Sequence, residues 1–415
     1  MRRNGCDAEN QMTTNLTGAQ DASSEAPRLI AFYLPQFYPT PYNDEWWGKG
    51  FTEWTNVVQG RPHFKDHYQP HLPADLGFYD LRLHEAREAQ ADLAREYGIH
   101  GFCYYHYWFN GRRILERPMD EVLASGRPTL PFCVCWANES WTRTWKGHQD
   151  KVLLQQSYSL EDDLRHIQHL LPILSDERYI QVDGKPMLLV YRIELLPDPV
   201  ATAETWRREA EKWGLRGLFL VSVESNYVAG VTSPGAAGFD ATVRFQPDYT
   251  VPAPALTQSP LQAGALKAIK AHAPWLYREM KRLKPQSVPD HIVDYAKLYR
   301  NWQNRSPRVE RHFECVTPMW DNSARRYRGA TIVKGSTPEL YEQWLREAVD
   351  RTVPGSDRQK TVFINAWNEW AEGCHLEPCH KWGRQYLEAT RRVYLGEEES
   401  VKRPSVDNQL LRSTS

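Results

Sequence analysis

The strongest constraint on the fold is an alternation of short β-type runs with longer helical segments along most of the chain. Runs rich in β-branched and aromatic residues occupy 29–34, 99–107, 130–136, 186–191, 217–223, 240–245, 315–320 and 362–367. Segments with helical periodicity fall between most of them, at 83–97, 160–174, 201–213, 289–302, 338–351 and 385–394. This alternation is typical of βα units around a parallel sheet, and it predicts an α/β fold, a single (β/α)8 TIM barrel with long βα-loop insertions.

The predicted barrel covers residues 28–396, between a disordered polar leader at 1–27 and a disordered tail at 397–415. Insertions interrupt the repeat at about 35–81 and 247–314. The first is dense in Trp, Pro and His, so we expect it to form part of a cleft wall. Within the second, residues 267–311 carry eleven Lys or Arg against four acids. This stretch is interpreted either as a solvated helical face or as a docking patch for an anionic membrane or glycolipid.

The composition narrows the class of ligand. The chain has 16 Trp and 21 Tyr, many of them among polar residues, and flat amphipathic rings in polar loops suit the apolar faces of sugars. A formal net charge of -1 supplies no global field that would attract nucleic acid, so no nucleic-acid partner is expected. The seven cysteines are scattered, and no apolar run suits a signal peptide or a membrane span. These features predict a cytoplasmic location.

The candidate catalytic residues follow the last β-type run. The segment 365–373 carries Glu369 and Glu372, two carboxylates three positions apart among tryptophans. Glycosidic bond cleavage needs one group that protonates the leaving oxygen and another that attacks or stabilises the anomeric side, and paired carboxyl groups usually fill both roles. Burial and mutual repulsion are expected to raise the pKa of one acid and leave the other ionised. The alternative interpretation is an N-terminal helix cap.

A second Asn-Glu pair follows the third β-type run, which makes Glu139 an alternative acid. Polar and aromatic residues near strand ends or in the first insertion are expected to bind substrate. They are Tyr33, Gln36, Trp46, Glu53, Trp54, Tyr105, His106, Tyr107, Trp136, Asn138, Tyr191, Trp320, Asp321, Asn368 and Trp370. The structural alternative is that such rings only close the core. No cofactor is expected, and the Cys-His pairs at 374–375 and 379–380 lack standard zinc spacing, so no metal site is predicted.

Several long motifs carry a family resemblance. They lie at 31–37, 43–54, 68–70, 101–105, 135–139 and 365–373. Together they resemble the WbsX family, also described as glycoside hydrolase family 99-like, over about residues 28–394. The resemblance implies a (β/α)8 barrel and a role around bacterial surface polysaccharide, such as the O-antigen of lipopolysaccharide. Members of the family are commonly labelled glycosyltransferases.

The resemblance also implies roles for the two acids. Family 99 enzymes are retaining endo-α-1,2-mannosidases or mannanases, and their two essential glutamates lie in an Asn-Glu-Trp-His-Glu-Gly motif that falls on 368–373. By this resemblance Glu369 deprotonates the sugar 2-hydroxyl to give a 1,2-anhydro sugar, and Glu372 acts as acid and then as base. The chain departs from the motif at Ala371, where the hydrolases have His, and this difference bears on the substrate.

Three functions remain open from the sequence. The first is a retaining endo-glycosidase-like enzyme that cleaves or transfers bonds of an oligo- or polysaccharide, free or lipid-linked. The second is a glycosyltransferase of polysaccharide biosynthesis, although a nucleotide-sugar enzyme would need a metal-bound Asp-x-Asp or a Gly-rich loop, and neither is found. The third is a non-catalytic glycan-binding barrel.

Overall fold

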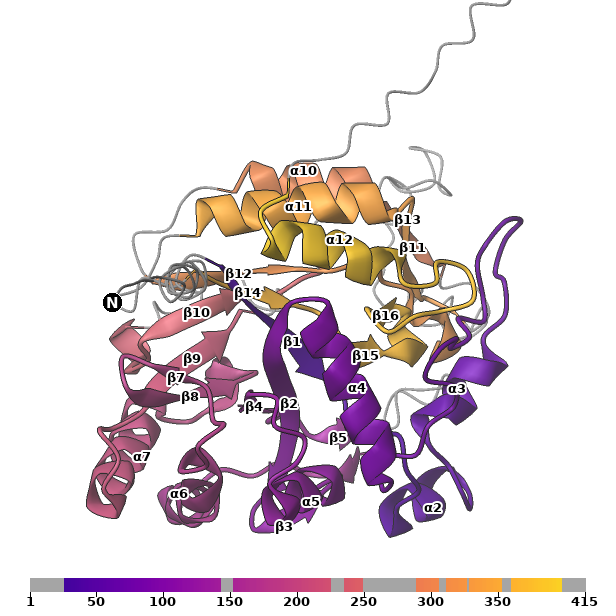
Figure 1. Cartoon of the computed structure of the whole chain (residues 1–415). Helices are drawn as coiled ribbons and strands as arrows, with labels where there is room; N and C mark the ends of the chain where they lie inside the picture. The colour runs from indigo at the N-terminus through magenta and orange to yellow at the C-terminus, as the bar shows by residue number, and fades with distance from the viewer. Residues whose placement is uncertain are drawn as a thin grey trace, which may run out of the picture.

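A computed structural model describes residues 26–142, 152–224, 235–248, 289–305, 311–326, 328–352 and 360–397. Eight parallel strands pair in the order β1, β2, β4, β8, β9, β10, β12 and β14, and β14 pairs back with β1 (Figure 1). They are β1 (Arg28–Tyr33), β2 (Ile99–Phe109), β4 (Phe132–Trp136), β8 (Lys185–Val190), β9 (Phe219–Val223), β10 (Ala241–Arg244), β12 (His312–Val316) and β14 (Thr361–Ile364). The predicted (β/α)8 barrel is therefore confirmed.

Helices surround the barrel and connect its strands (Figure 1). They are α2 (Pro41–Trp47), α3 (Glu53–Gln59), α4 (His84–Glu96), α5 (Arg117–Ser125), α6 (Leu160–Leu174), α7 (Pro199–Trp213), α10 (Tyr295–Gln303), α11 (Pro338–Arg351) and α12 (Gln385–Tyr394). Helix α6 begins where the side chain of Ser159 accepts a hydrogen bond from the Asp162 amide. Its apolar face buries Ile167, Leu170 and Leu174 completely, and each side chain contributes at most about 1.5–3 kcal/mol.

The barrel interior is filled by aromatic side chains. The Phe32 ring of β1 packs against Phe363 of β14 at 5.5 Å between centroids, against Phe245 at 5.3 Å and against Tyr105 of β2 at 5.6 Å. Both faces of β1 are buried, as expected for a strand with core on one side and helices on the other. The interior is a packed core, and any ligand site must lie above it.

Short elements fill the connecting loops. They are β3 (Arg112–Ile114), β5 (Trp141–Thr142), β6 (Val152–Leu154), β7 (Gln181–Val182), β11 (His291–Asp294), β13 (Thr331–Lys334), β15 (Asn368–Glu369), β16 (Cys374–His375) and the 3-10 turns η3 (Ile193–Leu195), η4 (Gly235–Ala237), η5 (Asn322–Ala324) and η6 (Trp370–Glu372). The seventh barrel strand is displaced from the predicted 315–320 to 312–316, so Trp320 lies in the following loop. The last strand ends at Ile364, three residues before the predicted end.

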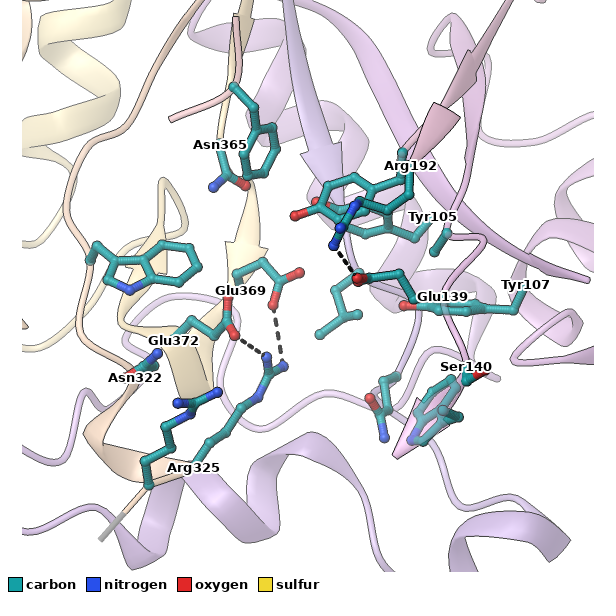
Figure 2. A pocket seen from close by; sticks show the side chains of 18 residues that line it. Tyr105, Tyr107, Glu139, Ser140, Arg192, Asn322, Arg325, Asn365, Glu369 and Glu372 are labelled. Atoms are coloured by element: carbon teal, nitrogen blue, oxygen red, sulfur yellow. Dashed lines mark hydrogen bonds and ion pairs between the residues drawn. The ribbon is translucent and has the colours of Figure 1, made fainter. Parts of the chain in front are cut away.

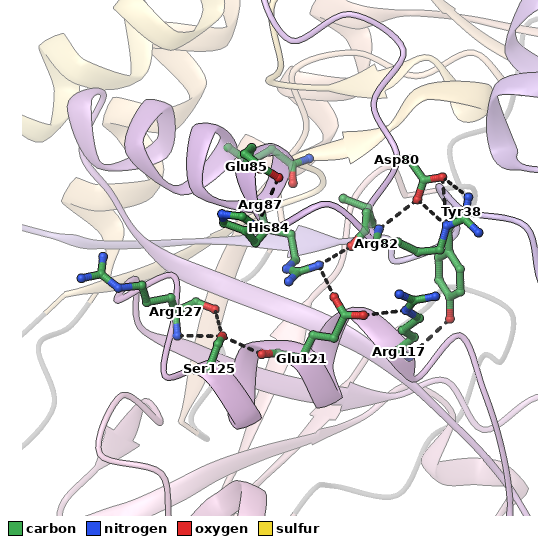
Figure 3. Close-up of polar contacts among 12 residues, drawn as sticks. Tyr38, Asp80, Arg82, His84, Glu85, Arg87, Arg117, Glu121, Ser125 and Arg127 are labelled. Atoms are coloured by element: carbon green, nitrogen blue, oxygen red, sulfur yellow. Dashed lines mark hydrogen bonds and ion pairs between the residues drawn. The ribbon is translucent and has the colours of Figure 1, made fainter.

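Ion pairs join the first insertion and α4 to α5 (Figure 3). The guanidinium of Arg87, on α4, donates to the Leu81 carbonyl at 2.5 Å and to Glu121 of α5 at 2.7 Å. Arg117 also donates to Glu121, at 2.5 Å, and its backbone amide donates to the Tyr38 hydroxyl at 3.3 Å. These contacts fix the insertion that carries α2 and α3 on the barrel.

Some predictions concern segments that are not described. The leader up to residue 25, the tail from 398 and most of the basic stretch 267–311 lie outside the described residues. Within the described ranges, no helix has the length and apolar character needed to cross a membrane.

Candidate active site

An open cavity of about 520 Å³ lies at the carboxyl ends of the barrel strands (Figure 2). It is lined by Leu34, Gln36, Tyr105, Tyr107, Ala137, Glu139, Ser140, Trp141, Tyr191, Arg192, Phe245, Trp320, Asn322, Arg325, Arg326, Asn365, Glu369 and Glu372. These residues belong to or follow β1, β2, β4, β8, β10, β12 and β14. The volume lies within the range of ligand pockets, and the place is where barrel enzymes hold their active sites.

Glu369 and Glu372 enter this cavity from the loop after β14. The chain pairs β15 with β16, and the 3-10 turn η6 between them brings two residues three positions apart to one side. Gly373 ends the turn at φ 55°, in the left-handed region, and a Cβ there would approach Asp321 to 2.9 Å. Glycine is thus required by both the backbone angle and the space. The Glu369 and Glu372 side chains are 8% and 21% exposed.

Arg325, in the loop after β12, holds both acids (Figure 2). Its Nη1 lies 2.6 Å from Glu372 and its Nη2 lies 3.3 Å from Glu369. The same guanidinium donates to Glu53 through Nε at 2.8 Å and through Nη2 at 2.5 Å. We call Arg325, Glu53, Glu369 and Glu372 the acid cluster. One cation therefore serves three carboxyl groups, and Glu53 is fully buried behind the cavity wall.

The acid cluster sets the protonation of Glu369. Burial raises the pKa of Glu369 to about 8, Arg325 opposes this shift, and the charges of Glu372 and Glu53 add to it. Burial also raises the pKa of Glu53, again against the attraction of Arg325. One guanidinium cannot neutralise three ionised carboxylates, so the site relieves the excess charge by keeping a proton on Glu369 near neutral pH.

Glu139 and Arg192 face the acid cluster from the other side of the cavity (Figure 2). Arg192 is ion-paired with both Glu139 and Glu194. Partial removal from water raises the pKa of Glu139, and the attraction of Arg192 opposes this shift. The Glu139 side chain is 48% exposed, so it is much more open to solvent than Glu369.

Two of the three cavity glutamates, Glu139 and Glu369, follow an asparagine that fixes a neighbouring strand end. The Asn138 amide donates to the Arg192 carbonyl at 2.8 Å and accepts from the Arg192 backbone amide at 2.8 Å. The Asn368 amide donates to the Leu34 carbonyl at 3.0 Å and accepts from the Leu34 backbone amide at 2.7 Å. Both asparagine side chains are buried. They position the glutamates and do not line the cavity themselves.

Two buried amide groups in the cavity wall have unused hydrogen-bonding capacity. Within the described part of the chain, Gln36 Nε2 and Asn365 Oδ1 have no hydrogen-bond partner. Their residues are 2% and 1% exposed, and both line the cavity. Buried polar atoms are normally satisfied by protein or by ordered water, and both of these atoms are covered by neighbouring atoms, so they do not by themselves identify a ligand.

Eight of the residues singled out in the sequence line the cavity, and the others lie elsewhere. Those in the lining are Gln36, Tyr105, Tyr107, Glu139, Tyr191, Trp320, Glu369 and Glu372. Those outside it are Tyr33, Trp46, Glu53, Trp54, His106, Trp136, Asn138, Asp321, Asn368 and Trp370. Trp46 lies beside it, because its ring packs at 6.1 Å from the ring of the lining residue Trp141.

Strand alternation explains three of the residues outside the lining. Tyr105 and Tyr107 of β2 face the cavity, so His106 between them faces α6, where its Nε2 lies 3.0 Å from that of His166. Tyr33 of β1 likewise faces α4, where its hydroxyl donates to Gln90 at 2.7 Å. Trp136 of β4 packs outward against His166, with ring centroids 4.6 Å apart.

The remaining residues form the support behind the acid pair. Trp54 packs on Trp370 at 5.6 Å between ring centroids, and the Trp370 indole donates to the buried Glu377 at 2.5 Å. Asp321 accepts hydrogen bonds from Gln69 and from the backbone amide of Ser323. These contacts hold the loops that carry Arg325, Glu369 and Glu372.

Arg325 is the main site residue that sequence reasoning did not identify. It lies 272 positions from Glu53 and 44 from Glu369, in a loop that shows no periodicity. The only local signal is the pair Arg325-Arg326 shortly after a predicted strand, and such pairs are common on protein surfaces.

The Cys-His pairs after the acids have structural contacts. The Cys374 thiol donates to the Asn365 carbonyl at 2.8 Å. The His375 ring stacks on Trp370 at 3.8 Å between centroids, and its Nδ1 lies 2.9 Å from the Glu377 carbonyl. Among the residues that the structure describes, no group of three or more His, Cys, Asp or Glu is placed to hold a metal ion.

The amino-acid sequence is similar to a described protein family and to curated proteins. A family model described as Glycosyltransferase WbsX matches residues 29–390. The uncharacterized protein WxcX of Xanthomonas campestris pv. campestris is 42% identical over 368 residues, which are 88% of this chain and 49% of WxcX. The chain thus spans about half the length of the curated relatives that it matches.

Two solved structures have a similar fold. One is the GH99 endo-alpha-mannosidase from Bacteroides thetaiotaomicron in complex with BIS-TRIS-propane, with a TM-score of 0.51, 13% identity and coverage of 88% of this chain and 95% of that chain. The other is named a glycoside hydrolase-like protein, with a TM-score of 0.55, 13% identity and coverage of 89% and 94%. At this level of identity the likeness concerns the fold alone.

Proposed function

We propose that this chain, which belongs to the WbsX glycosyltransferase family, is a carbohydrate-active enzyme that cleaves or transfers glycosidic bonds of a bacterial surface polysaccharide of the O-antigen or lipopolysaccharide type. One observation supports the proposal above the others. Glu369 and Glu372 lie on the same turn and both line an open cavity at the carboxyl ends of the barrel strands. Two carboxyl groups in one cleft are the usual equipment for acid and base steps at a glycosidic bond.

The two acids have distinct environments, as an acid and base pair requires. Glu369 is the more buried and carries the proton at neutral pH, because its pKa is about 8. Glu372 is the more exposed and lies closer to Arg325 than Glu369 does, at 2.6 Å against 3.3 Å. In the ligand-free cavity Glu369 is therefore equipped to donate a proton to a leaving oxygen. The resemblance to family 99 implies the reverse order, with Glu369 as the base.

The pH dependence of turnover separates the two orders. If Glu369 donates the proton, kcat declines above about pH 8 as this carboxyl ionises. If Glu369 is the base, kcat rises over the same range. Initial rates from pH 5 to 10, measured on one substrate, decide between these outcomes, and Glu369→Gln shows whether the transition belongs to this residue.

The rest of the lining suits a sugar ring. Tyr105, Tyr107, Tyr191 and Trp320 supply flat apolar surfaces, on which the apolar face of a pyranose can stack. The residue at 371, where family 99 hydrolases have His, is a fully buried alanine, so we do not extend the mannose specificity of those enzymes to this chain.

Two other functions have support of their own. The family description favours transfer, and the same acid pair would serve a transglycosylase that uses a lipid-linked donor. The ion pairs of Arg325 with Glu369 and Glu372 favour a non-catalytic glycan-binding barrel, because a guanidinium also neutralises acids that have no catalytic role. Catalysis remains the proposal because both acids line an open cavity. An ion pair with a purely structural role would not need this exposure to a ligand.

A substrate screen with matched variants tests the proposal. The protein is incubated with α-linked oligosaccharides and lipid-linked glycans, with and without an acceptor glycan, and NMR of the products reports linkage, stereochemistry and hydrolysis against transfer. We expect Glu372→Gln to lower kcat about 10²-fold or more while binding is retained. Glu204→Gln, on the exposed surface of α7, is the control and should leave kcat unchanged. Equal turnover by Glu372→Gln and the control would reject the catalytic assignment.

A further inference from the structure

A second, smaller cavity lies next to the first and has no part in the proposed chemistry. It is open, has a volume of about 120 Å³, and is lined by Phe64, Asp66, His67, Tyr68, His71, Met319, Trp320, Asp321, Ile332, Val333, Lys334, Gly335, Ser336, Gly373, Lys381, Trp382 and Tyr386. These residues come from the first insertion, from the loop after β12, from β13 and the residues that follow it, from Gly373 and from the segment after β16.

The two cavities share a wall. Trp320 lines both of them. Glu372 lines the first, the adjacent Gly373 lines the second, and the Glu372 carbonyl accepts a hydrogen bond from the Asp321 amide at 2.6 Å. The two cavities are therefore neighbours, with the backbone of Asp321, Glu372 and Gly373 between them.

The second cavity combines aromatic rings with amines. Nζ of Lys381 lies 4.8 Å from the ring centroid of Tyr68 and 4.8 Å from that of Trp382. Nζ of Lys334 lies 4.7 Å from the ring centroid of Phe64. Cation–π attraction holds each ammonium group at the cavity wall without neutralising its charge. Within the described ranges, neither amine has a carboxylate at ion-pair distance.

The acids of the second cavity leave these amines available. Asp321 is buried, and its oxygens are already bonded to His67 at 2.7 Å, Gln69 at 2.7 Å and the Ser323 amide at 3.0 Å. Asp66 is exposed at the edge. An incoming anion would thus meet the ammonium groups of Lys334 and Lys381 beside ring faces. Of the two acids in the lining, Asp321 already has hydrogen-bond partners for its oxygens.

We propose that the second cavity binds a sugar unit that bears a carboxylate, a uronic acid, within the same glycan that the first cavity holds. The Trp382 ring stacks on the pyranose, and Lys334 and Lys381 pair with its carboxylate. The proposal rests on the proposed function in taking a glycan as the ligand, and it adds that this glycan is acidic.

Calorimetric titration of the full chain tests this assignment. The probes are a trisaccharide of α-1,4-linked galacturonic acid and the matching neutral trisaccharide of galactose. We expect the acidic probe to bind at least about tenfold more tightly at low ionic strength, and we expect salt to reduce this preference. The double variant Lys334→Gln with Lys381→Gln should lose the preference, and Trp382→Ala should weaken the binding of both probes.

The matched control removes the same charge elsewhere. Lys185 begins β8, at the end of the barrel opposite the cavities, and Lys212 is exposed on α7, so Lys185→Gln with Lys212→Gln should keep the preference. Both cavity lysines are exposed, and thermal melting verifies that their variant is folded. Equal affinity of the unmodified protein for both probes, or a preference that survives loss of Lys334 and Lys381, would overturn the proposal.

The same variants distinguish failure of this site from failure of the proposed function. Glu372→Gln should lose turnover and keep the preference for the acidic probe. If Glu372→Gln retains full turnover while the lysine variant loses the preference, the catalytic assignment fails and the second site stands. If Glu372→Gln loses turnover while the lysine variant keeps the preference for the acidic probe, the second site is rejected and the catalytic assignment stands.

Discussion

The two Asn-Glu pairs of this barrel have the same design and different surroundings. Asn138 and Asn368 both follow a barrel strand, and both exchange two hydrogen bonds with the backbone at the end of the adjacent strand. The following residues, Glu139 and Glu369, both enter the first cavity. The local sequence thus builds the same support on two sides of the barrel.

The two glutamates differ in what the rest of the fold places around them. Glu139 is 48% exposed and pairs with Arg192. Glu369 is 8% exposed and shares Arg325 with two further carboxyl groups. Burial and the charges of two neighbouring acids raise the pKa of Glu369 to about 8, whereas the pKa of Glu139 is raised by its partial burial and the attraction of Arg192 opposes this shift. The comparison therefore favours Glu369, with Glu372, as the reactive side of the cavity.

The largest expected difference concerns stability on removal of the two arginines. Arg325→Gln leaves the fully buried Glu53 without its cation, and breaking a buried ion pair typically costs about 3–5 kcal/mol. Arg192→Gln leaves Glu139, which is 48% exposed, and Glu194, which is 19% exposed, without their cation, which should cost about 1 kcal/mol or less for each pair. Urea denaturation of both variants measures the two costs. Equal losses would mean that the two sides are not energetically distinct.

The next difference concerns activity. Glu369→Gln should lower kcat about 10²-fold or more, which corresponds to about 2.7 kcal/mol in the barrier. Glu139→Gln should lower it less than tenfold, because this residue is expected to contact the substrate without transferring a proton. Initial rates on the best glycan from the screen test both. A larger loss for Glu139→Gln would move the catalytic acid to the other side of the cavity.

A smaller and more symmetric effect is expected from the asparagines. Asn368→Ala leaves the buried amide and carbonyl of Leu34 without partners, which should cost about 1–3 kcal/mol of unfolding free energy. Asn138→Ala removes the partner of the Arg192 amide, whereas the Arg192 carbonyl still accepts from the Leu195 amide at 3.2 Å, so the cost should lie at the lower end of this range. Only Asn368→Ala should also lower kcat strongly, because only its neighbour is in the reactive pair. Urea midpoints and initial rates, measured on the same preparations, separate support from chemistry.

The smallest effect is a pH dependence of stability. The folded-state pKa of Glu369 is raised to about 8, so the folded protein binds this proton more tightly than the unfolded chain. The associated stability is complete below the ordinary glutamate pKa and is lost as the pH rises through 8. Between pH 7 and 8 the loss is about 1 kcal/mol, and Glu369→Gln should abolish it. If the urea midpoints of the variant and of the unmodified protein changed with pH in the same way over this range, the shifted pKa of Glu369 would be contradicted.

Much of the fold was predictable because its signals are local. Helices α6, α11 and α12 begin and end at the predicted residues, since apolar periodicity fixes a helix within its own segment. Ser159 and Thr337 also cap α6 and α11 with their side chains. The seventh strand was predicted too late in the sequence because the apolar run continues to Trp320, beyond the point where pairing with β10 and β14 ends. Strand pairing is a long-range property, and a run of apolar residues does not show where it stops.

The side chains that face the cavity were predictable only in part. Alternation along β2 guarantees that Tyr105 and Tyr107 face one way and His106 the other, but the sequence does not say which way is inward. Closure of the barrel decides it, because it fixes the rotation of each strand against both neighbours. For this reason His106 and Tyr33 support the helices although they adjoin residues of the cavity wall.

By itself, the sequence determined the order of strands and helices, the placement of two glutamates on one turn, and the glycine that ends this turn. Only the tertiary structure decided that Arg325 lies between Glu53, Glu369 and Glu372, and that Glu369 is buried while Glu139 is open. The physical reason is range. Backbone preferences act over a few residues, whereas the charge and burial that set a pKa come from segments hundreds of positions apart, which meet only when the barrel closes.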